Sequence, residues 1–349
     1  MTGNRTEVRR TGVFARVAGG GLLLFGVVCL AATFAGYMAS FRYLEMLADY
    51  RPYLLCACLG ALVGGVAAYH FGVRGRWMIA AVACAAVGTI VNALEVLPWV
   101  LASKPVYRSG DGIQVRPLKA VAFNVEGANT NFMATKAFIE RESPDLVMLC
   151  EATARWSEEL SVLKQGWKYH FRAESMDIEL YSRHPIVRTQ LFAYGPNRGF
   201  VAAQIQVERS EFTVMATHTY PRHWYGDEGY RHRTQAIQDG LGRRVSMLQQ
   251  PVVVLGDLNA SPWSPAYKAM MRTSGLRDAR WGNGLAPSHH GHGPVSRWLW
   301  RPIDHCLYSP EVSLDSFKVG PDLGSDHLPI VVTFRIPPGA IPGSGIPAK

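Results

Sequence analysis

The segment VVLGDLNASP, residues 253–262, decides the fold of the larger part of this chain. The apolar run 251–257 predicts a strand that is buried on both faces in a layered α/β domain. Asp257 and Asn259 follow at the point where this strand meets a loop. Side chains at the ends of neighbouring strands can converge on one crevice, so we expect these two residues to belong to a site.

Similar runs occur on both sides of this segment. Continuous apolar stretches predict further buried strands at 119–124, 145–151, 212–218, 303–308 and 328–336. Amphipathic or capped stretches predict helices at 131–142, 152–164, 230–248 and 264–274. Strands that alternate with helices indicate an α/β domain, which we place at residues 115–336.

Polar residues gather at or near the ends of these strands, in a set without cysteine ligands. The set comprises Asn124, Glu151, His218, Asp257, Asn259, Asp304, Asp326 and His327. Oxygen-rich donors of this kind suit Mg²⁺ or Mn²⁺ rather than structural zinc. Two histidines with carboxylates can also position a phosphoryl group and activate water. The net charge of +9 suits an anionic substrate or an anionic membrane surface, and it does not by itself indicate nucleic acid.

Seven short motifs in this order resemble the endonuclease/exonuclease/phosphatase superfamily, which includes deoxyribonuclease I-like nucleases, inositol-polyphosphate phosphatases and bacterial sphingomyelinases. They are AFNVEG (122–127), PDLVMLCE (144–151), LYSRHPI (180–186), ATHTY (216–220), VVLGDLNASP (253–262), PIDHCLYS (302–309) and GSDHLPI (324–330). The resemblance implies a four-layer α/β sandwich with two central mixed β-sheets.

The resemblance also implies a role for each residue of the set. Glu151 and Asn124 match the metal-binding positions, and Asp326 would lie near the metal. Asp257 would orient or deprotonate the attacking water, and Asn259 would bind that water or a phosphate oxygen. The remaining three residues would act on the phosphate: His327 would contact it, Asp304 would fix the His327 tautomer, and His218 would be a second contact.

Three apolar stretches precede this domain, at 17–41, 52–73 and 77–101. Each is long enough to cross a hydrocarbon core, which takes about 20 helical residues, so we expect three transmembrane helices within 17–103. Arginines are concentrated in the arm 1–16 and in the loop between the second and third stretch. Because positive loops stay in the cytoplasm, we expect a multi-pass protein of the cytoplasmic membrane with its catalytic domain on the extracytoplasmic side.

Several loop segments are interpreted without a role in the chemistry. We expect residues 104–114 to be a linker and the Pro- and Gly-rich tail 337–349 to be disordered. His289, His290 and His292 lack the i, i+4 spacing of helical zinc sites, and their Gly-rich context favours a flexible loop. Trp298 and Trp300 follow that loop, and the preference of Trp for membrane interfaces raises the hypothesis that they touch the bilayer.

The function expected from these features is that of a membrane-anchored, metal-dependent phosphoesterase. Three spans before such a domain resemble bacterial teicoplanin-resistance-type proteins, which are implicated in dephosphorylating a polyprenyl pyrophosphate carrier, so a lipid-linked substrate is preferred. An exported nuclease is the alternative, with a short strand-binding track at Arg222, His223, Trp224, Tyr225, Arg231 and Arg233. A catalytically inactive, membrane-tethered binding module is the alternative of another class.

Overall fold

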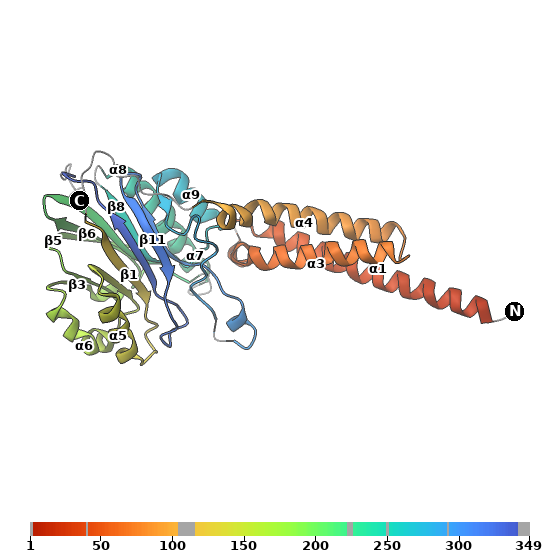
Figure 1. Cartoon of the computed structure of the whole chain (residues 1–349), viewed down its shortest axis with the longest axis horizontal. Coiled ribbons are helices and arrows are strands. Elements are labelled where there is room, and N and C mark those ends of the chain that lie inside the picture. The colour runs from red at the N-terminus through yellow and green to blue at the C-terminus, as the bar shows by residue number, and fades with distance from the viewer. Residues whose placement is uncertain are drawn as a thin grey trace. The chain divides into compact units, whose positions relative to one another are not determined.

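The computed structural model divides into two compact units, Met1–Pro98 and Trp99–Lys349, which are described separately (Figure 1). It describes residues 3–39, 41–103, 116–221, 226–248, 251–291 and 293–340. The predicted linker 104–114, the end of the predicted tail from residue 341, His292 and the segment 222–225 lie outside the described residues.

The N-terminal unit consists of helices. These are α1 (Gly3–Ala35), α2 (Arg42–Glu45), the 3₁₀ turn η1 (Met46–Tyr50), α3 (Arg51–His70) and α4 (Arg76–Leu101). By length and composition, two stretches could cross a membrane, Tyr43–His70 and Arg76–Leu101. The apolar helical stretch Gly19–Ala35 of α1 is shorter. At about 1.5 Å per residue, α4 exceeds the thickness of a hydrocarbon core.

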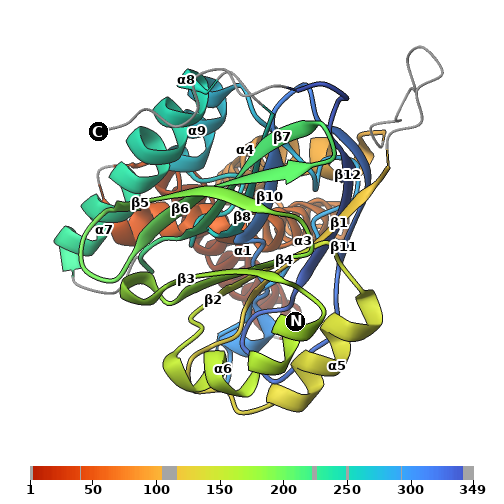
Figure 2. The same cartoon turned by 90° about the vertical axis from the view of Figure 1, so that its left-hand side faces the viewer.

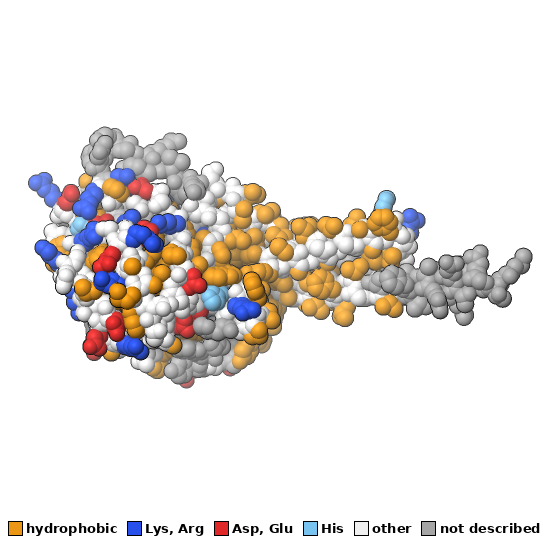
Figure 3. All heavy atoms as spheres, turned by 60° about the horizontal axis from the view of Figure 1, so that its bottom comes forward, with side chains coloured by type: hydrophobic (Ala, Val, Ile, Leu, Met, Phe, Trp, Pro, Cys, Tyr) orange, Lys and Arg blue, Asp and Glu red, His pale blue; other side chains and the backbone are white. Residues whose placement is uncertain are grey.

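The outer surface of these helices is apolar, as the hydrophobic side chains of the helical unit in Figure 3 show. Leu24, Val63 and Leu94 are exposed. Small residues lie between the helices instead: a Cβ added to Gly88 would come within 2.6 Å of the sulfur of Cys58. Apolar outer faces with small residues at the helix contacts are typical of helices that pack in a bilayer.

The C-terminal unit is built on two mixed sheets, as predicted, and each sheet has six strands (Figure 2). The first sheet has the strand order β11 (Ser313–Val319), β12 (Ile330–Arg335), β1 (Leu118–Asn124), β2 (Leu146–Cys150), β4 (Ile178–Ser182), β3 (Tyr169–Ala173). The second has the order β5 (Ile186–Ala193), β6 (Gly199–Val207), β7 (Ser210–His218), β8 (Val252–Asp257), β10 (Asp304–Tyr308), β9 (Arg277–Asp278). In each sheet one central pair is parallel, β1 with β2 and β7 with β8, and the other pairs are antiparallel.

The apolar faces of the two sheets share one core, in which Leu146 and Leu180 of the first sheet belong to the same buried cluster as Val214 and Leu255 of the second. Helices α5 (Phe132–Glu142) and α6 (Ala154–Glu159) cover the outer face of the first sheet through a second cluster. Helices α7 (Gly226–Gln235), α8 (Arg244–Met247) and α9 (Pro265–Ser274) accompany the second sheet, where a third cluster is buried. This arrangement is the four-layer α/β sandwich that the motifs implied.

One departure from the predicted elements concerns the single helix expected at 230–248. In its place α7 passes into a π-helical segment, η4 (Ala236–Arg243), and then into α8. Gly240 lies in this segment, and a Cβ there would come within 2.8 Å of Phe200 and 2.9 Å of Tyr194. Glycine at this position therefore lets the backbone of the π-helical segment lie directly against these two aromatic side chains.

Candidate functional site

Strand pairing brings the ends of β1, β2, β7, β8 and β10 to one end of the sandwich. Asn124 ends β1 and pairs with Cys150, so that Glu151 follows directly on the neighbouring strand. His218 ends β7 and pairs with Asp257 at the end of β8. Asp304 begins β10 and pairs with Asp257 from the other side. The two sheets thus each contribute side chains to one place.

Gly256 makes this convergence possible on the second sheet. Its φ of 133° is a conformation that residues with a Cβ rarely adopt. A Cβ at this position would collide with the carbonyl oxygen of Thr217 on β7. The glycine before Asp257 is therefore required by the close approach of the two strands that carry His218 and Asp257.

His327 and Asp304 form a buried hydrogen-bonded pair, with the histidine Nδ1 2.8 Å from a carboxylate oxygen. The hydroxyl of Ser288 donates to the same carboxylate at 2.7 Å. Burial alone would lower the pKa of His327, but the carboxylates of Asp304 and Asp257 outweigh burial and raise it to about 10. Burial favours a raised pKa for Asp304, but the positive charge of His327 outweighs burial, and the pKa of Asp304 is lowered. At neutral pH the pair is therefore an imidazolium held by a carboxylate.

Asp257 is held by two amide side chains and one backbone group. Its carboxylate accepts from the backbone N–H of Asn259 at 2.7 Å and from the Asn259 side chain at 3.0 Å. The side chain of Asn124 donates to it at 3.3 Å. Burial raises the pKa of Asp257 to about 7, although the positive charge of His327 opposes the rise. A carboxylate with this pKa can accept a proton from water at neutral pH.

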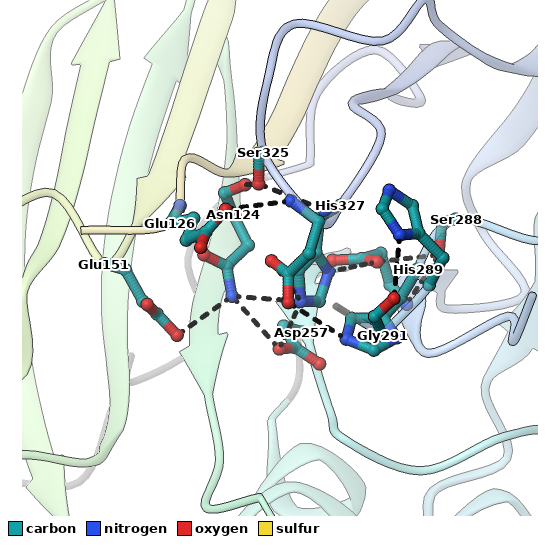
Figure 4. Close-up of polar contacts among 12 residues, drawn as sticks. Asn124, Glu126, Glu151, Asp257, Ser288, His289, Gly291, Ser325 and His327 are labelled. Carbon is teal, nitrogen blue, oxygen red and sulfur yellow. Dashed lines mark hydrogen bonds and ion pairs between the residues drawn. The ribbon is translucent and has the colours of Figure 1, made fainter. Parts of the chain in front are cut away.

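Glu151 lies on the opposite side of the site from His289, with Asn124, Asp257 and His327 between them (Figure 4). Its carboxylate accepts from the Asn124 side chain at 3.2 Å and from the backbone N–H of Gly127 at 3.4 Å. Glu151 has a φ of 56°, in the left-handed region. Such backbone is uncommon for a residue with a side chain and is concentrated at functional sites.

His218 is fully buried, and among the described residues neither of its ring nitrogens has a hydrogen-bond partner. Its Nε2 lies 3.4 Å from Glu151 and 3.9 Å from Asp257. Burial, together with Arg198 and His327, lowers its pKa well below the ordinary value, so the ring is neutral. Buried polar atoms without partners are rare in folded proteins, and here they lie beside the carboxylates of the site.

A family model matches residues 121–327, which is more than half of the chain, and this range contains all eight residues of the predicted set. The chain belongs to the Endonuclease/Exonuclease/phosphatase family. No curated protein sequence matches it.

Similar solved structures share the fold at low sequence identity. D. rerio TDP2, in a complex with a single-strand DNA product, is 16% identical with a TM-score of 0.52, over 63% of this chain and 99% of that one. An endonuclease/exonuclease/phosphatase family protein from Bacteroides thetaiotaomicron is 15% identical with a TM-score of 0.51, over 64% of this chain and 100% of that one. At these identities the likeness establishes the fold alone.

Among the described residues, two groups offer ligand atoms within 4.8 Å of one another and could hold a metal ion, His289–Asp326–His327 and Asp257–Asp304–His327, and Glu151 belongs to neither. At the Glu151 end the donors are the oxygens of that carboxylate, which Mg²⁺ and Mn²⁺ prefer, whereas Asn124 turns its amide nitrogen to Glu151 and its oxygen to the backbone N–H of Glu126. The carboxylate of Asp326 belongs to the same site, 3.9 Å from His327 Nε2. Asp304 is engaged by His327 and Ser288 instead, so its role here is to hold the histidine.

The structure corrects the interpretation of His289, for which the sequence favoured a flexible loop. His289 is buried, its ring centroid lies 4.4 Å from that of His327, and its backbone bridges both Arg301 and His327. Glu126 is absent from the predicted set, although its carboxylate accepts from the backbone N–H of Asp326 at 3.0 Å. Both contacts join segments that are distant in the sequence, so no local pattern announces them.

Proposed function

We propose that this protein is a membrane-anchored phosphoesterase that hydrolyses a phosphate ester or pyrophosphate on a lipid-linked substrate with the help of Mg²⁺ or Mn²⁺. The family consists of metal-dependent phosphoester hydrolases. The observation that carries the proposal is the convergence of a carboxylate with a raised pKa, Asp257, and a protonated histidine, His327, whose Nε2 lies 3.7 Å from it.

These two residues divide the work of an in-line attack by water. Asp257, held by Asn259, takes a proton from the attacking water while the oxygen of that water forms a bond to phosphorus. His327 donates from Nε2 to a phosphoryl oxygen and stabilises the negative charge that develops as the bond to the leaving oxygen breaks. No covalent nucleophile is needed, because the base and the donor act directly on water and phosphate.

Glu151, Asn124 and Asp326 would hold the divalent ion. When bound, the ion supplies positive charge that polarises a phosphoryl oxygen. The neutral ring of His218 lies beside Glu151 and Asp257 and can donate one hydrogen bond to the substrate phosphate.

The helical unit supports membrane anchoring. Together with the apolar part of α1, the two long apolar stretches would give three spans, and the arginines of the loop at 74–76 would keep that loop in the cytoplasm. The catalytic unit would then lie on the extracytoplasmic side. Anchoring raises the local concentration of a substrate that resides in the same membrane, which favours a lipid-linked phosphate or pyrophosphate.

A nuclease is the second candidate, because TDP2, one of the similar structures, is complexed with a DNA product. The basic track expected to bind a nucleic-acid strand has fewer accessible residues than the sequence indicated. Arg233 is fully buried and packs on the ring of Tyr230, so it cannot contact a nucleic-acid strand. Arg231 is exposed, and residues 222–225 lie outside the described part of the chain.

Purified full-length protein in detergent with Mg²⁺ tests the proposal. Phosphate release would be measured from a polyprenyl pyrophosphate and from a lipid phosphate, and cleavage from single- and double-stranded DNA. Release from the lipid substrates supports the proposal, and DNA cleavage without it selects the nuclease. Inactivity on every phosphoester would leave a binding module.

A further inference from the structure

A buried arginine supports the backbone of Asp304. Arg280 follows β9 in the sequence, and its side chain is only 1% exposed. Its guanidinium nitrogen Nη2 donates a hydrogen bond to the backbone carbonyl oxygen of Asp304 at 2.5 Å. Because the carboxylate of Asp304 in turn holds Nδ1 of His327, Arg280 is connected to the proposed imidazolium through a single residue.

The carboxylate of Asp278 holds Arg280 in place. Nη1 of Arg280 donates to it at 3.2 Å, and the backbone N–H of Arg280 donates to its other oxygen at 2.7 Å. The hydroxyl of Tyr267 donates to the same carboxylate at 2.5 Å. All three side chains are buried. A planar guanidinium that is fixed at one nitrogen by a buried carboxylate has little freedom to turn, so Nη2 stays directed at the carbonyl oxygen of Asp304.

His305 extends this network to the loop that follows β8. Its Nδ1 lies 3.3 Å from Nη1 of Arg280, and its Nε2 lies 2.8 Å from the carbonyl oxygen of Ala260. Ala260 directly follows Asn259, whose backbone and side chain both donate to the proposed base. The network of Arg280 therefore contacts both the strand that begins with Asp304 and the loop that carries Asn259. It joins the supports of the two groups that are proposed to act on water and phosphate.

We propose that Arg280 is a positioning residue of this site. By binding the carbonyl oxygen of Asp304, it sets where the carboxylate of Asp304 holds His327, and thus where Nε2 of His327 meets the phosphate. The inference rests on the proposed phosphoesterase function and adds a residue that does not touch the substrate. A charge pair with Asp278 alone would need only one guanidinium nitrogen, whereas the second nitrogen binds the backbone of Asp304. Misplacement of a reacting group by about 1 Å can cost on the order of 100-fold in rate.

Arg280→Lys tests this in the detergent-solubilised full chain with Mg²⁺, by phosphate release from a polyprenyl pyrophosphate. The lysine keeps a positive charge beside Asp278, but its single nitrogen cannot also bind the carbonyl oxygen of Asp304. We expect kcat to fall by about tenfold and KM to stay within about threefold, because the placement of His327 matters most in the transition state. Tyr267→Phe is the matched control. It removes a hydrogen bond to Asp278 in the same network, so it should lower the denaturant midpoint of unfolding while kcat stays within about twofold.

A double-mutant cycle with Asp304→Ala shows whether the effect passes through Asp304. In Asp304→Ala the carbonyl that Arg280 binds remains, whereas the carboxylate that holds His327 is gone. Arg280→Lys should therefore lower kcat by less than about twofold further in this background. If Arg280→Lys does not fold, Arg280→Met combined with Asp278→Asn takes its place, with the same results expected. Removing both charges together leaves no unpaired charge in the interior.

Three results would overturn the inference and leave the proposed function standing. The first is a full tenfold loss of kcat from Arg280→Lys in the Asp304→Ala background. The second is a kcat in Arg280→Lys within about twofold of the wild type, whether or not KM changes. The third is an equal loss of kcat in Tyr267→Phe and Arg280→Lys, because activity would then follow stability alone. A wild type that releases no phosphate would defeat the proposed function itself, and the inference with it.

Discussion

Nδ1 of His327 lies 2.8 Å from a carboxylate oxygen of Asp304, and the two side chains are buried together. Asp304 sits on β10 of the second sheet, whereas His327 comes from the loop before β12 of the first. The pair therefore joins the two sheets at the site. It fixes the direction of Nε2 and keeps the ring charged, and both properties can be tested separately.

Asp304→Asn should lower turnover by about 100-fold and shift the pH dependence. The pKa of His327 is raised to about 10, so its protonated form is present at neutral pH and is lost as the pH rises through that value. Without the Asp304 charge this pKa falls, and the alkaline limb of the pH–rate profile should move to lower pH. An unchanged limb in the variant would mean that His327 is not the group that must stay protonated.

Asp257→Ala and His327→Ala should each reduce turnover on the order of 10³-fold, because each removes one partner in the proton transfer or in charge stabilisation. Single-turnover rates of phosphate release measure this. Asp315→Ala is the matched control. Asp315 forms an ion pair at 2.9 Å with Arg335, the last residue of β12, whereas His327 precedes the first residue of that strand. Wild-type rates in either site variant would show that the roles are misassigned.

Chelation with EDTA should abolish activity, and Mg²⁺ or Mn²⁺ should restore it. Glu151→Gln removes a charged oxygen ligand, so the metal concentration for half-maximal activity should rise by about tenfold or more. Glu174→Gln serves as the control because Glu174 is a solvent-exposed partner of Arg172. If the Glu151→Gln variant and the wild type need the same metal concentration, Glu151 does not bind the ion.

Asp278 should give the domain a stability that depends on acid pH. Burial raises the pKa of Asp278, but Arg280, 3.2 Å away, and His305 outweigh it and lower the pKa to about 2. A depressed pKa contributes stability above the unfolded value of about 4, and this contribution is lost as the pH falls towards 2. Relative to the wild type, Asp278→Asn should lose on the order of 2 kcal/mol at pH 7, and the difference should shrink below pH 4.

Denaturant unfolding of both proteins at pH 7, 5 and 3 measures this difference. Asp315→Asn is again the control, because its pair with Arg335 is partly exposed and contributes little. A stability difference that stays constant from pH 7 to pH 3 would contradict the assignment to the Asp278 charge.

The loop that carries Trp298 and Trp300 provides a test of membrane contact. Trp298 is 68% exposed, an unusual position for so large an apolar side chain, and exposed Trp is favoured at bilayer interfaces. A soluble version that begins at residue 104 should sediment with anionic lipid vesicles, and changing both residues to Ser should weaken this binding several-fold. Equal binding after the double change would remove the hypothesis.

The sequence predicts the centre of the fold better than its periphery. Strands β1, β2, β7, β8, β10 and β12 are buried, and each appears in the sequence as a continuous apolar run. Strand β5 is largely exposed, with polar residues such as Arg188 and Gln190 along it, so no apolar run marks it. The same holds for β11, whose solvent-facing positions include Asp315 and Lys318.

Two buried strands escape this rule because polar side chains interrupt them. Glu179 lies within β4 and is fully buried, where it accepts from Ser157 of α6. Gln204 lies within β6 and donates to Glu211 on the neighbouring strand. The partners that make these polar residues tolerable in the interior come from other elements, so the local sequence does not reveal the strands.

The candidate site likewise contains residues that the sequence predicts and others that it does not. Its eight predicted residues follow strand ends in family motifs, and the structure brings them together. His289 has no such local signal, since its partner Arg301 is 12 residues away and its contact with His327 depends on a β-bridge between loops. Long-range loop pairing of this kind has no periodicity that a sequence can display.

The left-handed backbone at Glu151 and at Asn259, where φ is 47°, sets a limit on how robust this protein can become. Glycine adopts that conformation with less strain, but glycine would bring neither a carboxylate nor an amide to the phosphate. Glycine at either position should therefore raise the stability of the fold and abolish the proposed chemistry, so that stability and activity oppose each other at these two residues.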